Sequence, residues 1–201
     1  MVIILLAVLA FGVIHSVLAG NAARAAFRRQ FGERAYHGLY RLVYNAIAVV
    51  TAAPLALLLV VLPGRELWRS EGTLLAAALA VQLIGVCGFL IALLQVDMGR
   101  FIGLSQLRAY VMGAALPLPP EPLQQSGLYG LVRHPLYLFS LLVMWPMPVM
   151  TDTLLMFNLA ATAYLLVGSR LEEKRLVALF GQEYVDYRRR VPWLLPFLRS
   201  R

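Results

Sequence analysis

The chain has 201 residues, of which 61% are hydrophobic and 14% are charged, and its formal net charge is +8. Soluble domains are roughly 25% charged and 45–50% apolar, so this composition excludes an ordinary soluble domain and indicates an integral membrane protein. The single cysteine, Cys87, excludes an internal disulfide, and no metal site is expected. At this length we expect one membrane domain over residues 1–201, with an N-terminal part (1–112) and a C-terminal part (113–201).

Five apolar segments predict an all-α protein with about five transmembrane helices: residues 1–19, 42–62, 73–95, 136–150 and 153–168. The first three have about the 20 residues that a helix needs to cross a bilayer. The last two have about 15 or 16 residues each, or roughly 24 Å of helix, and only Thr151 and Asp152 separate them. We therefore expect a short helical hairpin, whose first arm is kinked or ended by Pro146 and Pro148. Whether this hairpin crosses the bilayer fully stays open.

The first segment has no basic residue before its apolar run, so we interpret it as a span and not as a cleavable signal peptide. Lysine and arginine are unevenly distributed among the loops. Residues 20–41 hold five, 98–134 hold three and 170–201 hold eight, whereas 64–72 hold two and the hairpin turn holds none. Positive charge gathers on the cytoplasmic side of membrane proteins. We therefore expect a protein of the bacterial inner membrane, with its N-terminus outside and a helical C-terminal tail in the cytoplasm, whose basic residues contact lipid and not nucleic acid.

A charged site is predicted where the hairpin begins and ends. Arg133-His134-Pro135 opens the hairpin, and Pro135 suits the first turn of a helix. Glu172 and Glu173 follow the second arm, and because a hairpin brings its ends together, these carboxylates should face Arg133 and His134. Charged groups at a membrane boundary are costly unless they bind something. The alternative interpretations are interfacial anchoring for the basic pair and plain ion pairing for the carboxylates.

The tail that follows adds aromatic and basic groups. An apolar stripe is expected on a helix over residues 170–180, which Gly181 should end. Tyr184, Tyr187 and Arg188 then follow at helical spacing. A pocket with both signs of charge and aromatic rings fits a zwitterionic cofactor that contains an aromatic group. Taken alone, the arginine run 188–190 is more often a lipid-contacting patch.

A resemblance to a known family rests on residues 127–196. They contain the run G-x-Y-x-x-V-R-H-P-x-Y, then the hairpin, then E-E-x-x-L-x-x-x-F-G-x-x-Y-x-x-Y-x-x-x-V-P-x-x-x-P. This pattern resembles the isoprenylcysteine carboxyl methyltransferase and phospholipid methyltransferase family, whose members are membrane enzymes that use S-adenosylmethionine. A finer resemblance, to bacterial methanethiol S-methyltransferase-like and NnrU-like proteins, rests on Trp145, residues 148–151, Thr162-Ala163-Tyr164, Gly168, His15-Ser16, Tyr44-Asn45 and Gly103-Leu104-x-Gln106.

The resemblance implies that S-adenosylmethionine is held by His134, Tyr137, Glu172, Glu173, Tyr184, Tyr187 and Arg188. The acidic pair would receive the cofactor's amino or ribose groups. Arg133 and His134 would be catalytic, with Arg133 nearest the transferred methyl group and His134 as a general base for a thiol acceptor. The chain departs from the family at Phe139, where glycine is common. A bulky ring there is expected to reshape the cofactor site or to redirect substrate choice.

Two polar residues near the membrane interior complete the candidate set. His15 lies in the first span and Asn45 starts the second, and such residues are functional candidates at the substrate end of the pocket. The alternative is a hydrogen bond between helices.

Three classes of function remain open at this stage. The first is an S-adenosylmethionine-dependent methyltransferase that acts at the cytoplasmic membrane face on a small thiol, a prenylcysteine carboxylate or another lipid-like acceptor. The second is a non-catalytic NnrU-like membrane accessory protein. The third is an NADPH-dependent membrane reductase, since the steroid-reductase type resembles this architecture at its C-terminal end. The identity of the cofactor distinguishes the three classes.

Overall fold

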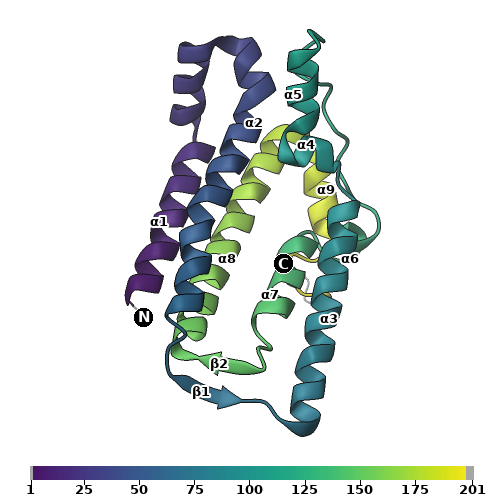
Figure 1. Cartoon of the computed structure of the whole chain (residues 1–201). Coiled ribbons are helices and arrows are strands. Elements are labelled where there is room, and N and C mark those ends of the chain that lie inside the picture. The colour runs from purple at the N-terminus through teal and green to yellow at the C-terminus, as the bar shows by residue number, and fades with distance from the viewer. Residues whose placement is uncertain (1, 198–201) are drawn as a thin grey trace. The chain divides into compact units, whose positions relative to one another are not determined.

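The computed structural model describes residues 2–197, so Met1 of the first predicted span and residues 198–201 of the tail lie outside the described residues. The chain divides into two compact units. Unit 1 comprises the chain up to Pro63 together with Asp97–Glu121, and unit 2 comprises Gly64–Val96 together with the chain from Pro122 onward. Figure 1 labels the helices and strands that belong to each.

Unit 1 is built on two long helices, α1 (Val2–Ala19) and α2 (Asn21–Val61), which pack against each other. The predicted span 42–62 is therefore only the C-terminal half of a much longer helix. The N-terminal half of α2 carries the arginines of the predicted loop 20–41, and the helix is interrupted at Gly32, where φ is 83°. Two short helices, α4 (Met98–Ile102) and α5 (Leu104–Val111), pack on α2.

Unit 2 contains α3 (Gly72–Leu94), α6 (Leu128–Leu131), α7 (Pro135–Met144), α8 (Asp152–Phe180) and α9 (Gln182–Arg190). It also contains two short strands, β1 (Glu66–Arg69) and β2 (Val149–Thr151), which pair antiparallel with Trp68 opposite Met150. The strands lie at the N-terminal ends of α3 and α8 (Figure 1). This pairing ties the loop before α3 to the connection between α7 and α8.

Four helices of the described chain are long and apolar enough to cross a bilayer, namely α1, α2, α3 and α8. This finding supports a multi-pass, all-α membrane protein. The helix that follows the Arg-His-Pro triplet, α7, has only 10 residues, or roughly 15 Å at 1.5 Å per residue. It is therefore too short to cross a hydrocarbon core of about 30 Å by itself.

The prediction of a two-residue turn between the arms of the hairpin is wrong. As expected, α7 ends before the two prolines, but it ends at Met144 and not near residue 150, and the connection runs through β2. The second arm begins at Asp152, one residue before its predicted start. This arm does not stop near Gly168. It continues as one helix to Phe180, so the separately predicted helix 170–180 is its last third. Leu171 and Leu179 on the predicted apolar stripe are 44% and 68% exposed, so this stripe is not buried among the described residues.

The C-terminal end of α7 is hydrogen-bonded to the N-terminal part of α8. The side-chain amide of Asn158 donates to the carbonyl of Met144 at 2.7 Å, and the indole of Trp145 donates to the Thr162 hydroxyl at 3.1 Å. Most of the α7 surface instead packs against α3. Gln82 of α3 donates to the carbonyl of Val143 at 3.1 Å, so α3 positions the short helix that carries the triplet.

Phe139 contributes to this packing between α3 and α7. Its ring is 8% exposed and lies directly over Gly88 of α3, where a Cβ would overlap the ring. The bulky residue at the family's glycine position is therefore matched by a glycine on the neighbouring helix. In this structure Phe139 fills the space between α3 and α7.

Gly88→Ala should destabilise the protein by about 1–3 kcal/mol, since overpacking displaces the Phe139 ring. Thermal unfolding of the detergent-purified chain measures the change. Gly168→Ala is a matched control on α8, because a Cβ there meets no atom within 4 Å; it should leave stability unchanged or raise it slightly through helix propensity. Equal stability of Gly88→Ala and Gly168→Ala would contradict the packing described for Phe139.

Candidate active site

The triplet lies in an extended stretch between α6 and α7, beside the end of the tail. The backbone N–H of Arg133 donates to the carbonyl of Pro192 at 2.9 Å, and that of His134 donates to the carbonyl of Trp193 at 3.3 Å. Pro135 occupies the first turn of α7, as predicted. The residues after α9 are thus bonded along the start of α7, which encloses the triplet.

Arg133 forms a buried ion pair with Glu173. Its Nε lies 2.7 Å from Oε1 of Glu173, and the two side chains are only 1% and 6% exposed. The guanidinium also donates to the carbonyls of Arg188 at 2.7 Å and Val191 at 2.9 Å. Arg133 therefore ties α7, α8 and the tail together, and its predicted place beside the transferred methyl group stays a prediction.

His134 lies between the two carboxylates. Its Nδ1 is 3.6 Å from Oε2 of Glu172, its Nε2 is 3.4 Å from Oε1 of Glu173, and its ring stacks on Tyr137. Burial by itself lowers the pKa of His134, but hydrogen bonding and the charges of Glu172 and Glu173 outweigh burial and raise it. A raised pKa favours the protonated ring, the form that pairs with both carboxylates, and the general-base role of His134 stays a prediction.

The two adjacent glutamates, Glu172 and Glu173, differ in how far they are exposed. Glu173 is buried against Arg133, whereas the side chain of Glu172 is 47% exposed. The Tyr137 hydroxyl donates to Oε2 of Glu172 at 2.8 Å, which orients the carboxylate. Glu172 is therefore the carboxylate that a ligand can reach, and Glu173 is a structural anchor.

The tail supplies two buried tyrosines. Tyr184 and Tyr187 are 1% and 3% exposed, and their rings meet edge to face at 5.7 Å. The Tyr187 hydroxyl donates to the carbonyl of Tyr129 at 2.6 Å. Burial, reinforced by Glu172, raises the pKa of Tyr129 to about 12, and burial also raises the pKa values of Tyr184 and Tyr187. All three rings stay protonated and can only donate or accept neutral hydrogen bonds.

Two buried polar groups of unit 2 have no hydrogen-bond partner among the described residues: Tyr184 Oη and Trp193 Nε1. Leaving a buried polar group unpaired costs about 1–3 kcal/mol. Such groups are rare in folded proteins, and each calls for an explanation. Both lie in the tail that packs along the triplet, where the sequence predicts the cofactor.

Two residues of this region were missed by sequence reasoning. Trp193 carries one of the unpaired donors, and the Arg170 guanidinium lies 3.7 Å from the centroid of its ring. The predicted residue Arg188 contributes its backbone carbonyl to Arg133 and exposes its side chain. Val191-Pro192 predicts a turn of the chain, but the contacts of this segment with Arg133 and His134 were not predicted.

The other two predicted residues, His15 and Asn45, belong to unit 1. The side-chain amide of Asn45 donates to the carbonyls of Phe101 at 3.1 Å and Ile102 at 3.0 Å, so it caps the end of α4. The ring of His15 lies against those of Phe11 and Tyr44. Asn45 thus makes the helix-to-helix contact that was its alternative interpretation, and a substrate role for either residue stays a prediction.

Comparison with known proteins identifies the family. Residues 3–146 match the family model described as "NnrU protein". The chain belongs to the NnrU family. This match includes the triplet and all of α7, and it confirms the finer of the two resemblances.

Relatives of this NnrU-family chain align over nearly its whole length. It is 39% identical to methanethiol S-methyltransferase 2 of Bradyrhizobium diazoefficiens, over 95% of this chain and 71% of that protein. It is 34% identical to methanethiol S-methyltransferase 1 of the same organism, over 99% and 68% of the two chains. It is 31% identical to the methanethiol S-methyltransferase of Pseudomonas deceptionensis, over 94% and 70%. No solved structure matches the chain.

Proposed function

We propose that this NnrU-family protein is a membrane methyltransferase that transfers a methyl group from S-adenosylmethionine to a small thiol, methanethiol. The observation that carries the proposal is the similarity to methanethiol S-methyltransferases over 94–99% of the chain. A small thiol is favoured over a prenylcysteine carboxylate or a lipid amine because those relatives are named for methanethiol.

The residues of unit 2 fit S-adenosylmethionine. This cofactor carries an ammonium group, a carboxylate, ribose hydroxyls and an adenine ring. Glu172 has an exposed carboxylate suited to the ammonium or the ribose, and the unpaired Tyr184 and Trp193 are donors suited to the carboxylate or the adenine nitrogens. When bound, S-adenosylmethionine supplies an electrophilic methyl group on a positively charged sulfur.

The chain's own residues contribute positioning and electrostatics. Arg133 and Glu173 hold the tail against α7, so that Tyr184 and Tyr187 exclude water from the region beside Glu172. When protonated, His134 would hold both carboxylates in place, and a cation close to a thiol favours its thiolate form. Positioning of this kind lowers a barrier by up to about 7–11 kcal/mol in the best-oriented reactions.

The same proposal places the N-terminus outside and the tail in the cytoplasm of the bacterial inner membrane. Besides the distribution of arginines, the pairing of β1 with β2 supports this topology, because it joins the loop before α3 to the connection between α7 and α8. Both segments are on the non-cytoplasmic side if α7 and α8 together act as an inserted hairpin. Cofactor then reaches the site from the cytoplasm.

Calorimetry of S-adenosylmethionine with the detergent-purified full chain tests the proposal. We expect saturable binding that weakens roughly 10- to 100-fold in Glu172→Gln, since hydrogen bonds to a charged group contribute about 1.5–3 kcal/mol. Tyr184→Phe should also bind more weakly, without unfolding earlier, because the Tyr184 hydroxyl has no hydrogen-bond partner among residues 2–197. Glu71→Gln removes an exposed carboxylate elsewhere in unit 2 and is the matched control.

A second assay measures the acceptor. The wild-type chain with S-adenosylmethionine and methanethiol should form dimethyl sulfide, which gas chromatography detects, and Glu172→Gln should form much less. Failure of the well-folded chain to bind the cofactor would favour the accessory class. Saturable binding of NADPH in its place would favour the reductase class.

A further inference from the structure

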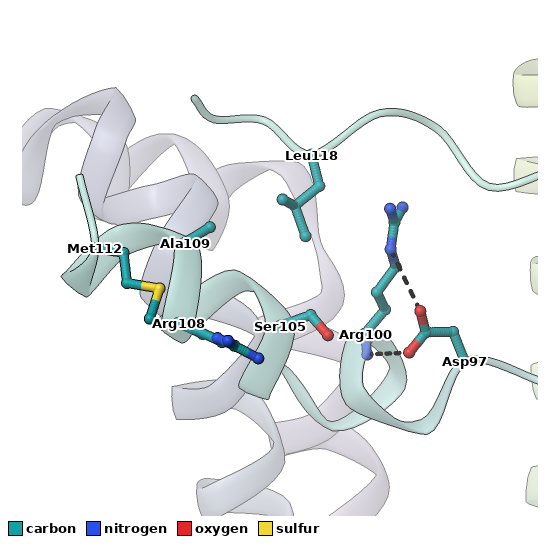
Figure 2. A pocket seen from close by; sticks show the side chains of 7 residues that line it. All are labelled: Asp97, Arg100, Ser105, Arg108, Ala109, Met112 and Leu118. Atoms are coloured by element: carbon teal, nitrogen blue, oxygen red, sulfur yellow. Dashed lines mark hydrogen bonds and ion pairs between the residues drawn. The ribbon is translucent and has the colours of Figure 1, made fainter. Parts of the chain in front are cut away.

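A hollow of about 380 Å³ lies on unit 1, and the proposed methyl transfer does not use it. It is lined by Asp97, Arg100, Ser105, Arg108, Ala109, Met112 and Leu118. Figure 2 shows Ser105, Arg108 and Ala109 on α5 and Met112 directly after it, with Arg100 and Asp97 of the α4 segment across from them and Leu118 on the loop that follows. Polar and apolar groups are thus both present in one depression.

The two arginines of the hollow differ in their surroundings. Arg100 is compensated, because its Nε lies 3.5 Å from Asp97 and 3.4 Å from Glu121, and its Nη1 donates to the carbonyl of Pro119. Arg108 is exposed, and no hydrogen bond or ion pair of its guanidinium is found among the described residues. One unpaired cation therefore stands beside the Ser105 hydroxyl, and the lining residues together carry a single net positive charge.

Polar side chains of α2 hold the walls of this hollow in place. The Nε of Arg41 donates to the carbonyl of Phe101 at 2.9 Å, beside the two bonds from Asn45. Arg34 donates to the carbonyls of Tyr110 at 3.3 Å and Ala114 at 3.1 Å, at the end of α5. Gly103 joins α4 to α5 with φ of 96°, and a Cβ there would lie 2.7 Å from the backbone nitrogen of Leu42. The geometry of the hollow is therefore set before any ligand arrives, which lowers the entropic cost of binding.

The surface around the hollow is apolar and exposed. Phe101 and Leu104 are 42% and 49% exposed, and Val111 and Met112 are 73% and 67% exposed. In a membrane protein, large apolar side chains in such positions contact lipid chains. An anion bound beside Arg108 would thus carry its apolar part along α4 and α5.

From this arrangement we propose that the hollow binds the phosphate diester of an anionic phospholipid headgroup, with Arg108 and Ser105 as its donors. A phosphate diester carries one negative charge, which matches the single net positive charge of the lining. Met112 and Leu118 contact the glycerol and the first methylene groups. Basic pockets of this kind at the membrane surface are typical of lipid recognition.

Native mass spectrometry of the full chain from neutral detergent micelles tests the proposal, with dioleoylphosphatidylglycerol, dioleoylphosphatidylcholine and inorganic phosphate as separate probes. We expect one retained phosphatidylglycerol per wild-type chain, and at least a tenfold lower occupancy in Arg108→Ala. Arg29→Ala is the matched control, because it removes an exposed arginine of the same unit that does not line the hollow. It should retain the lipid as the wild type does.

Each other outcome overturns the proposal. Equal retention of phosphatidylglycerol by the wild type, Arg29→Ala and Arg108→Ala would identify ordinary annular lipid. If the wild type retained phosphatidylcholine as well as phosphatidylglycerol, the net charge of the lipid would not matter for binding. Arg108-dependent binding of inorganic phosphate without the lipid would identify a soluble ligand. Should Arg108→Ala unfold earlier than the wild type, Arg108→Lys serves in its place, and it should keep the charge and partly retain the lipid.

Discussion

Arg133→Ala should destabilise the protein by about 3–5 kcal/mol, because removing one partner of a buried ion pair leaves the other charge uncompensated. Glu173 would stay buried at 6% exposure without its cation, and the carbonyls of Arg188 and Val191 would lose their donor. Unfolding of the detergent-purified variant, followed by circular dichroism, measures the loss. The same variant should also expose the tail, so that limited proteolysis cuts it after α8 much faster than in the wild type.

Lys174→Ala is the matched control, since it removes an exposed cation from the residue next to Glu173. It should change the free energy of unfolding by no more than about 0.5 kcal/mol, as surface substitutions usually do. If Arg133→Ala were as stable as Lys174→Ala, the ion pair would not hold the tail.

His134→Gln should lower stability by about 1.5–3 kcal/mol in mild acid, because hydrogen bonds to charged groups contribute that much and Glu172 and Glu173 would lose the imidazole that lies between them. The effect depends on pH in a defined direction. Glu172 and Glu173 raise the pKa of His134 in the folded protein. The stability that this residue contributes is therefore complete below the ordinary histidine value of about 6.5 and is lost as the pH rises through the raised value.

The free energy of unfolding, measured from pH 5 to pH 9, tests this prediction. Tyr137 and Arg133, which lie in the same cluster as His134, are kept in both proteins. The wild type should lose stability relative to His134→Gln as the pH rises, until the two approach each other. His37→Gln is the control, because His37 pairs only with an exposed carboxylate, that of Glu33, at 3.4 Å. A constant difference between wild type and His134→Gln across this range would show that the histidine acts only by packing.

The juxtaposition of Arg133 and His134 with Glu172 and Glu173 was predictable from order along the chain. Two consecutive apolar segments return the chain to its starting side, so the residues before the first and after the second must approach each other. The contacts of 2.7 to 3.6 Å among these four side chains confirm this proximity. The membrane class and the family resemblance likewise followed from composition and from motifs with intact spacing.

Which of the two glutamates is buried and which is exposed was not predictable from order along the chain. Adjacent glutamates on a helix point in directions about 100° apart, so Glu173 pairs with Arg133 while Glu172 accepts from Tyr137 and stays partly exposed. Which one is buried depends on how α8 is rotated against the tail. The packing of α7 against α3 was not predictable either, because the Phe139–Gly88 contact joins residues that are distant in sequence.

By itself, the sequence determined the class of protein, the presence of long apolar helices and the proximity of four charged residues, because hydropathy and local spacing act along the chain. Only the tertiary structure decided that α7 is short and packs on α3, that Arg133 anchors the tail, and that Glu172 stays accessible. The physical reason is that burial and pairing depend on neighbours distant in the chain, which no periodicity in the sequence specifies.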